Sequence, residues 1–114
     1  MTARTRRSAA ALVDLLEFCA MGERLTSRGR RAYNEDEVVR LAAEAVVHRI
    51  GEAVGRLPAT LTDAHPEVEW RKIRAMRNVV AHDYGRIDHD IVWAALVRRV
   101  PHLRACVDAI LRER

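Results

Sequence analysis

The sequence predicts an all-α protein, an up-and-down bundle of four to five helices in one domain that spans residues 1–114. Only five residues are aromatic, so the core must be built from Ala, Leu, Val and Ile, a composition that favours packed helices. Apolar residues recur at three- and four-residue spacing, and no alternation of Val, Ile and Thr indicates a strand. With 114 residues, 49% hydrophobic and 32% charged, the chain has the size and composition of one globular domain.

The first helix is expected over residues 8–21, because apolar residues there repeat at helical spacing and Gly22 follows as a terminator. The residues that mark this face are Leu12, Leu15, Leu16 and Cys19. Residues 22–33 are polar and basic, and we expect a loop or a short, weak helix. Such a segment could contact RNA, although a solvated connector is the more common meaning of a basic run.

A long second helix is expected over residues 38–57. Asn34 is a good N-cap, Glu37 completes a capping box, and Pro58 ends the helix. Its buried face is predicted to contain Val39, Ala43, Val46, Val47, Ile50 and Val54. Residues 62–66 should form the next connector.

A third helix should begin near Glu67 or Trp70 and end near Ala81 or His82, before Gly85. Its packing side is predicted to contain Trp70, Ile73, Met76 and Val80.

Asp88 is expected to cap a fourth helix that extends to Val97. Its inward residues are predicted to be Ile91, Val92, Ala95 and Leu96. Pro101 should then either kink this helix or begin a fifth one that reaches Leu111.

Charge and composition restrict the function only weakly. The formal charge is +4, carried almost entirely by arginine, which suits phosphate recognition but is also typical of a GC-rich genome. Cys19 and Cys106 lack metal-ligand spacing, so neither a disulfide nor a metal site is predicted. Asp14 and Glu17 interrupt the first apolar run, and no stretch is long enough to span a membrane. We therefore expect a cytoplasmic protein with no membrane partner.

The segment most suggestive of chemistry is Arg77-Asn78-Val79-Val80-Ala81-His82-Asp83-Tyr84, at the end of the third helix. Arginine offers a fork of donors to phosphate oxygens, and histidine can exchange a proton near neutral pH. On a regular helix Asn78 and His82 lie about 40° apart and can hydrogen-bond. Arg77 and His82 lie about 140° apart and do not converge.

Two arrangements would bring the arginine and the histidine together: unwinding of the backbone near His82, or a site assembled from two copies of the chain. Cleavage of RNA by transesterification needs a base, an acid and a cation. A symmetric homodimer would supply two histidines and two arginines without a metal or cofactor, and we therefore predict a homodimer.

Each residue also has a structural interpretation. Arg77 and His82 could serve only the end of the helix, and Tyr84 could be a packing aromatic residue. Glu52 could pair with Arg77 from the neighbouring helix, or it could be an exposed glutamate on a polar face.

This segment resembles the Arg-x4-His-x-Tyr signature of HEPN-domain ribonucleases, and it is most similar to the HepT-like toxins. The resemblance covers roughly residues 34–105. Further matching motifs are Ile50-Gly51-Glu52-Ala53, His65-Pro66, Trp70-Arg71, Met76-Arg77-Asn78 and Ile91-Val92-Trp93.

The resemblance implies a dimeric, HEPN-like helical ribonuclease that acts without metal as the toxin of a bacterial toxin–antitoxin pair, with tRNA or mRNA as substrate. Its partner would be a nucleotidyltransferase antitoxin that transfers AMP from ATP to Tyr84. Arg77 would hold the scissile phosphate, His82 would be the acid–base, and Asn78 would orient His82 or the phosphate. Asp83 and Glu52 are candidates for a supporting role.

The sequence departs from common family members at Tyr84-Gly85-Arg86, where an aromatic residue often follows the tyrosine, and in the basic segment 22–33. Two other hypotheses stay open. The chain could be a non-catalytic helical module that binds a nucleotidyltransferase or a nucleotide, or the motif could be only a helix end in a dimer interface.

Overall fold

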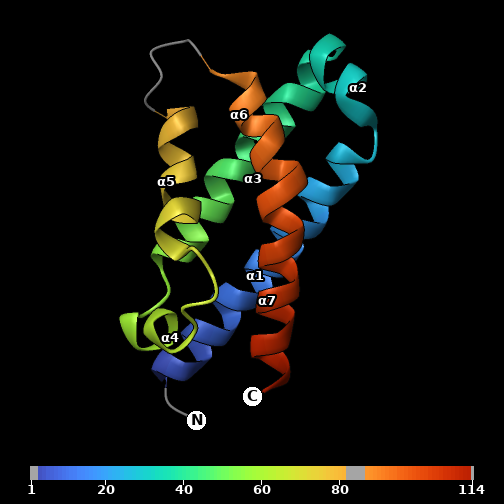
Figure 1. The fold of residues 1–114 in the computed structure, drawn as a ribbon. Helices are drawn as coiled ribbons and strands as arrows, with labels where there is room; N and C mark the ends of the chain where they lie inside the picture. Colours follow the sequence, from blue (N-terminus) through green and yellow to red (C-terminus); the bar gives the residue numbers. More distant parts are fainter. Residues whose placement is uncertain (1–2, 82–86, 114) are drawn as a thin grey trace.

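The computed structural model describes residues 3–81 and 87–113, and the regular structure in that part of the chain is all helical. Four long segments alternate in direction: α1 (Ala3–Thr26), α3 (Glu37–Gly55), α5 (Trp70–Ala81), and a continuous rod of α6 (His89–Ala94), the π-helical turn η1 (Ala95–Arg99) and α7 (Val100–Arg112). Two short helices, α2 (Gly29–Glu35) and α4 (Ala59–Ala64), lie in the connections (Figure 1). The predicted all-α, up-and-down bundle is confirmed.

The central element is α3, which packs against α1 on one side and against α5 on the other, while α7 packs along α1. All six residues predicted for its inner face are buried: Val39, Ala43, Val46, Val47, Ile50 and Val54. A fully buried Val, Leu or Ile contributes about 1.5–3 kcal/mol relative to an exposed one. This face is therefore a main source of the stability of the bundle.

Helix α1 is longer than predicted, because Gly22 does not terminate it. Gly22 is buried inside the helix, where an added Cβ would lie 3.3 Å from Cγ1 of Val100. The glycine therefore permits close packing of α1 on the rod. The turn after α1 leads into Gly29, the first residue of α2, whose φ of +89° favours glycine.

The basic segment forms the end of α1 and most of the short helix α2 (Gly29–Glu35), and a short helix was one of the two predicted forms. Asn34 is not an N-cap but lies within α2, where its Oδ1 accepts a hydrogen bond from Nε of Arg30 at 2.9 Å. The residue that caps α3 is Asp36, whose carboxylate accepts from the backbone N–H of Val38.

The connector after α3 also differs from the expectation. Helix α3 ends at Gly55, and Pro58 is the N-cap of α4, which includes Thr62 and Asp63. Helix α5 then begins at Trp70, one of the two predicted starts, and Trp70, Ile73 and Met76 are buried as predicted. The side chain of Val80 and the expected terminator Gly85 lie outside the described residues.

Asp88 caps α6 as predicted, through its carboxylate and the backbone N–H groups of Asp90 and Ile91. The inward assignment of Ile91 was wrong, because this side chain is 51% exposed. Pro101 lies in the first turn of α7 and follows η1, where the N–H of Val100 bonds to the carbonyl of Ala95, five residues back. A wider turn accommodates a proline that has no N–H to donate.

Candidate active site

Arg77 is positioned by tight packing of α5 against α3. Gly51 faces Arg77 across this contact, and an added Cβ at Gly51 would lie 2.8 Å from Cβ of Arg77 and 3.1 Å from the carbonyl oxygen of Arg74. Any larger residue at position 51 would push the two helices apart. The glycine in Ile50-Gly51-Glu52-Ala53 therefore allows the close approach of α3 to Arg77.

The guanidinium of Arg77 is held by Glu52, with Nη1 at 2.9 Å from Oε1. The structure thus forms the pair that the sequence left as one of two alternatives, although Glu52 is not buried. The side chains are 34% and 48% exposed, and ion pairs at such positions contribute at most about 1 kcal/mol. The role that fits this pair is orientation of the guanidinium toward solvent.

His48 is a member of this cluster that sequence reasoning missed. Its Nε2 lies 3.9 Å from Oε1 of Glu52, one helical turn away on α3, and its side chain is 44% exposed. The signal was the spacing, because residues four apart on a helix face each other.

Arg74 adds a second positive charge on the same seam. An added Cβ at Gly55 would lie 3.4 Å from Nε of Arg74, so this side chain crosses α3 one turn from Arg77. Arg74 makes no ion pair with any described residue. The seam between α3 and α5 therefore carries two guanidinium groups and one carboxylate, an arrangement suited to an anion.

Asn78 is exposed on the last turns of α5, and its side chain makes no hydrogen bond to a described residue. The other predicted site residues, His82, Asp83 and Tyr84, lie outside the described residues. The structure therefore brings Arg77 together with Glu52 and His48, and the rest of the predicted site stays a prediction.

The chain that follows the motif is fixed by a cluster of α2 and α6 side chains. The hydroxyl of Tyr33 lies 2.8 Å from Nδ1 of His89, and burial raises the pKa of Tyr33 to about 12. The guanidinium of Arg30 lies 5.7 Å from the ring centroids of both Tyr33 and Trp93, and it pairs with Asp90 at 2.5 Å.

This cluster corrects the interpretation of the basic segment as a solvated connector. Arg30 is structural, because it secures α2 to the start of α6 by cation–π contacts and an ion pair. Both segments adjoining the motif are thereby fixed: α5 by its packing on α3, and α6 by this cluster.

Cys19 is a buried free thiol whose pKa burial raises to about 12, and Cys106 is a partly exposed free thiol. None of the helices in the described part of the chain is long and apolar enough to cross a membrane.

Comparison with known proteins gives one family and several relatives. The family model described as "Ribonuclease HepT-like" matches residues 15–110. The protein named "Putative RNase TTE0752" of Caldanaerobacter subterraneus subsp. tengcongensis is 30% identical over 103 residues, which cover 90% of this chain and 92% of that protein. "Putative RNase MJ1216" of Methanocaldococcus jannaschii is 23% identical over 107 residues, which cover 91% of this chain and 87% of that protein.

A third relative, "Probable ribonuclease HepT" of Thermococcus cleftensis, is 29% identical over 69 residues, which cover 60% of this chain and 63% of that protein. No solved structure matches the chain.

Proposed function

The chain belongs to the HepT-like ribonuclease family, and we propose that it is an endoribonuclease that cleaves RNA without a metal ion at Arg77 and His82. The observation that carries the proposal is the Arg77–Glu52 pair, which fixes a partly exposed guanidinium five residues before His82. A fixed guanidinium is suited to a phosphate whose negative charge increases during reaction.

The proposed reaction is a transesterification. The 2′-hydroxyl loses its proton to a base and attacks the adjacent phosphorus, the P–O5′ bond breaks, and the 5′-oxygen takes a proton from an acid. The products end in a 2′,3′-cyclic phosphate and a 5′-hydroxyl. In this scheme His82 exchanges the protons and Arg77 stabilises the phosphate charge. Asn78 orients His82 or the phosphate, and Asp83 and Glu52 have supporting roles.

The test is cleavage of an RNA and of a DNA with the same sequence in the presence of a chelator. The proposal expects RNA products with cyclic phosphate ends and intact DNA, because DNA lacks the attacking hydroxyl. Intact RNA, or equal cleavage of both substrates, would refute it. His82→Ala should fold and should neither cleave RNA nor stop cell growth.

We also propose that the site is completed by a second copy of the chain, packed along α3. Val38, Leu41, Ala45, His48 and Glu52 repeat at three- and four-residue spacing on α3 and lie within about 80° of each other around the helix axis. Val38 and Leu41 are 74% and 57% exposed, although both are large apolar residues. This row of five α3 residues ends at Glu52, so a partner packed along it would lie beside Arg77.

Leu41→Glu tests this interface, with Val97→Glu as the control, since Val97 is 44% exposed on η1 rather than on α3. The mass in solution should fall to that of a monomer for Leu41→Glu and stay dimeric for Val97→Glu. Cleavage should fall with the dimer. A monomeric wild-type chain that cleaves RNA would contradict the proposed assembly.

The family resemblance further supports a role as the toxin of a toxin–antitoxin pair, acting on tRNA or mRNA in the cytoplasm. We propose that a nucleotidyltransferase antitoxin transfers AMP to Tyr84, which would place bulk and negative charge next to the phosphate-binding arginine. Intact mass after incubation with the antitoxin and ATP should increase by one AMP for wild type and not for Tyr84→Phe. An equal increase in both would refute Tyr84 as the acceptor.

A further inference from the structure

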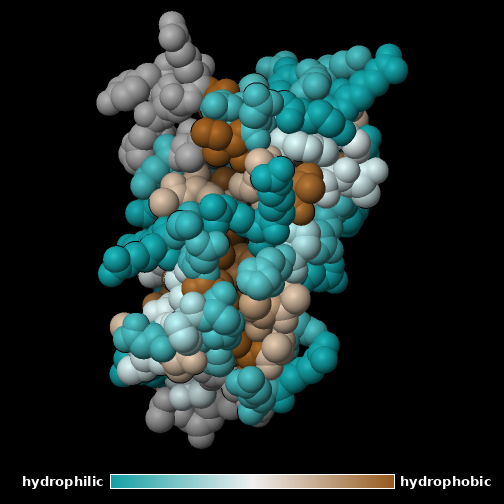
Figure 2. Space-filling view, in the orientation of Figure 1, coloured by the Kyte–Doolittle hydropathy of each residue, from teal (hydrophilic) through white to brown (hydrophobic). Residues whose placement is uncertain are grey.

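A groove separates α5 from the rod formed by α6, η1 and α7. Its volume is about 770 Å³, within the range of small-molecule sites. Its apolar lining includes Ile73, Met76 and Ala95, which are already buried and so form a floor. Figure 2 shows brown apolar atoms along the seam between α5 and the rod, with hydrophilic side chains beside and across it.

Positive charge dominates the polar lining of this groove. Lys72 lies on the α5 wall, and Arg98 and Arg99 lie on the opposite wall, where the imidazole of His102 also lines the groove. Glu69 is the one acid among the described lining residues. Arg98 makes no ion pair with any described residue. Ile91, which is 51% exposed, also lines the groove, so a ligand entering it would meet both apolar surface and cations.

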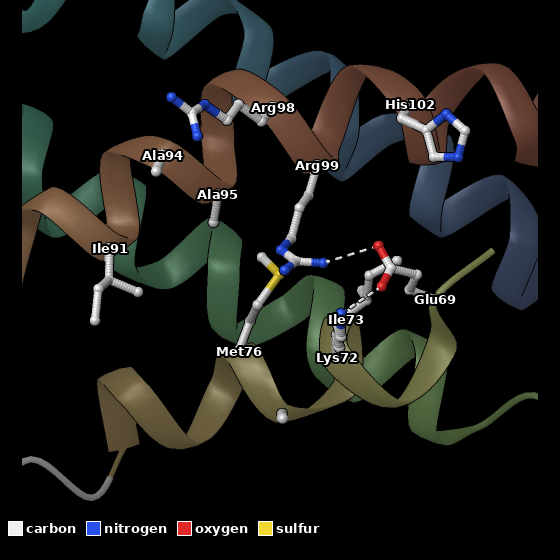
Figure 3. Close-up of a pocket in the computed structure, with 11 residues that line it drawn as sticks. Glu69, Lys72, Ile73, Met76, Ile91, Ala94, Ala95, Arg98, Arg99 and His102 are labelled. Atoms are coloured by element: carbon white, nitrogen blue, oxygen red, sulfur yellow. Dashed lines mark hydrogen bonds and ion pairs between the residues drawn. The ribbon is translucent and has the colours of Figure 1, made fainter.

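Two of these cations converge on one carboxylate. Nζ of Lys72 lies 2.7 Å from Oε2 of Glu69, and Nη1 of Arg99 reaches across from η1 to lie 3.5 Å from Oε1. Figure 3 shows this bridge between the two walls, beside Met76. The Glu69 side chain is 57% exposed, so it can turn away into solvent. Its carboxylate therefore occupies the place of an anion held by cations from both walls.

We propose that the groove is a second phosphate-binding subsite for RNA, in which a backbone phosphate replaces the Glu69 carboxylate between Lys72 and Arg99. The choice of RNA as the ligand rests on the proposed function. Phosphate resembles carboxylate in charge and offers more acceptor oxygens, and arginine can bind it through two donors. Apart from the imidazole of His102, the described lining contains no ring that could stack on a base, so the subsite would recognise mainly the backbone.

Removal of a cation and removal of the carboxylate should have opposite effects on RNA binding. Lys72→Gln and Arg99→Gln should each weaken RNA binding by about fivefold, as expected for an exposed charge contact. Glu69→Gln should tighten binding, because it removes the competing anion and frees both cations. The controls are Arg71→Gln on α5 and Glu67→Gln just before it, which change the same charges at exposed residues outside the groove.

The experiment measures binding of a fluorescent 2′-O-methyl RNA by variants of the 114-residue chain. This RNA lacks the attacking hydroxyl and cannot be cleaved. The proposal expects larger changes for the groove variants than for their controls, and a smaller dependence of affinity on salt for Lys72→Gln and Arg99→Gln. Equal effects of Glu69→Gln and Glu67→Gln, or of Lys72→Gln and Arg71→Gln, would overturn it, as would a wild-type chain that does not bind this RNA.

Cleavage of ordinary RNA by the wild type is measured separately and distinguishes the two proposals. Cleavage with no effect of the groove variants on binding refutes the subsite and leaves the ribonuclease standing. Altered binding without any cleavage refutes the ribonuclease and leaves the subsite standing.

Discussion

Substitution of Gly51 by alanine should move Arg77 out of position, because the two helices are in contact there. The added Cβ would lie 2.8 Å from Cβ of Arg77, whereas carbon atoms pack at about 3.8 Å. The other near neighbours are backbone atoms of Arg74 and Arg77, which cannot rotate away. Helix α5 must therefore move by about 1 Å to relieve the contact.

The energetic cost follows from two opposing terms. Overpacking costs about 1–3 kcal/mol, and the better helix propensity of alanine returns up to about 1 kcal/mol. Gly55→Ala is the matched control, because its added Cβ would meet only the side chain of Arg74 at 3.4 Å. Gly55→Ala should therefore be neutral or stabilising. The free energy of unfolding of Gly51→Ala should be about 1–3 kcal/mol lower than that of this control.

Activity provides the second measurement for this pair. A displacement of about 1 Å at a reacting group can reduce a rate on the order of 100-fold. Gly51→Ala should therefore lose most RNA cleavage under conditions where it is still folded, and Gly55→Ala should retain it. Equal stability and equal activity of the two variants in denaturation and cleavage assays would refute the role assigned to Gly51.

Two further predictions concern the residues around the motif. Tyr33→Phe should lower the free energy of unfolding by about 1 kcal/mol at neutral pH, because it removes the hydrogen bond to His89. Since burial raises the pKa of Tyr33 from 10.0 to about 12, only the unfolded chain ionises Tyr33 between those values, and wild-type stability should fall across pH 10–12 more steeply than that of Tyr33→Phe. If urea denaturation shows the same decline in the stability of wild type and of Tyr33→Phe across pH 10–12, this prediction is wrong. Glu52→Gln should change stability by less than about 1 kcal/mol but should lower RNA cleavage, and unchanged cleavage would show that Arg77 needs no orientation by Glu52.

The helices could be predicted from the sequence because their apolar spacing is regular. The inner face of α3 was assigned correctly from Val39 to Val54, since burial along one helix follows directly from the helical period. Boundaries were less predictable. Asn34 and Asp36 are both good caps, and the choice between them depended on α2, which includes the pair Arg31–Glu35.

Long-range contacts explain the remaining differences. Gly22 was interpreted as a terminator because its local sequence does not show that Val100 lies 3.3 Å from its added Cβ. The basic segment was interpreted as solvated because its partners, His89, Asp90 and Trp93, are about 60 residues away. A single sequence does not show such partners.

The candidate site was predictable in part. The Arg77–Glu52 pair could be proposed because Glu52 lies on the neighbouring helix, but its exposure and the approach of His48 needed the packing of α3 against α5. The groove between Lys72 and Arg99 was not predicted, because its walls come from helices that the sequence does not place side by side.

The proposed ribonuclease activity depends on Arg77 and His82, which together would cleave RNA without a metal. Its most direct test is the single-turnover rate of RNA cleavage by wild type, Arg77→Ala and His82→Ala in the presence of a chelator, with folding of each variant checked by circular dichroism. Wild type should cleave RNA, and each folded variant should lose activity on the order of 100-fold or more. Cleavage by either variant at the wild-type rate would contradict it.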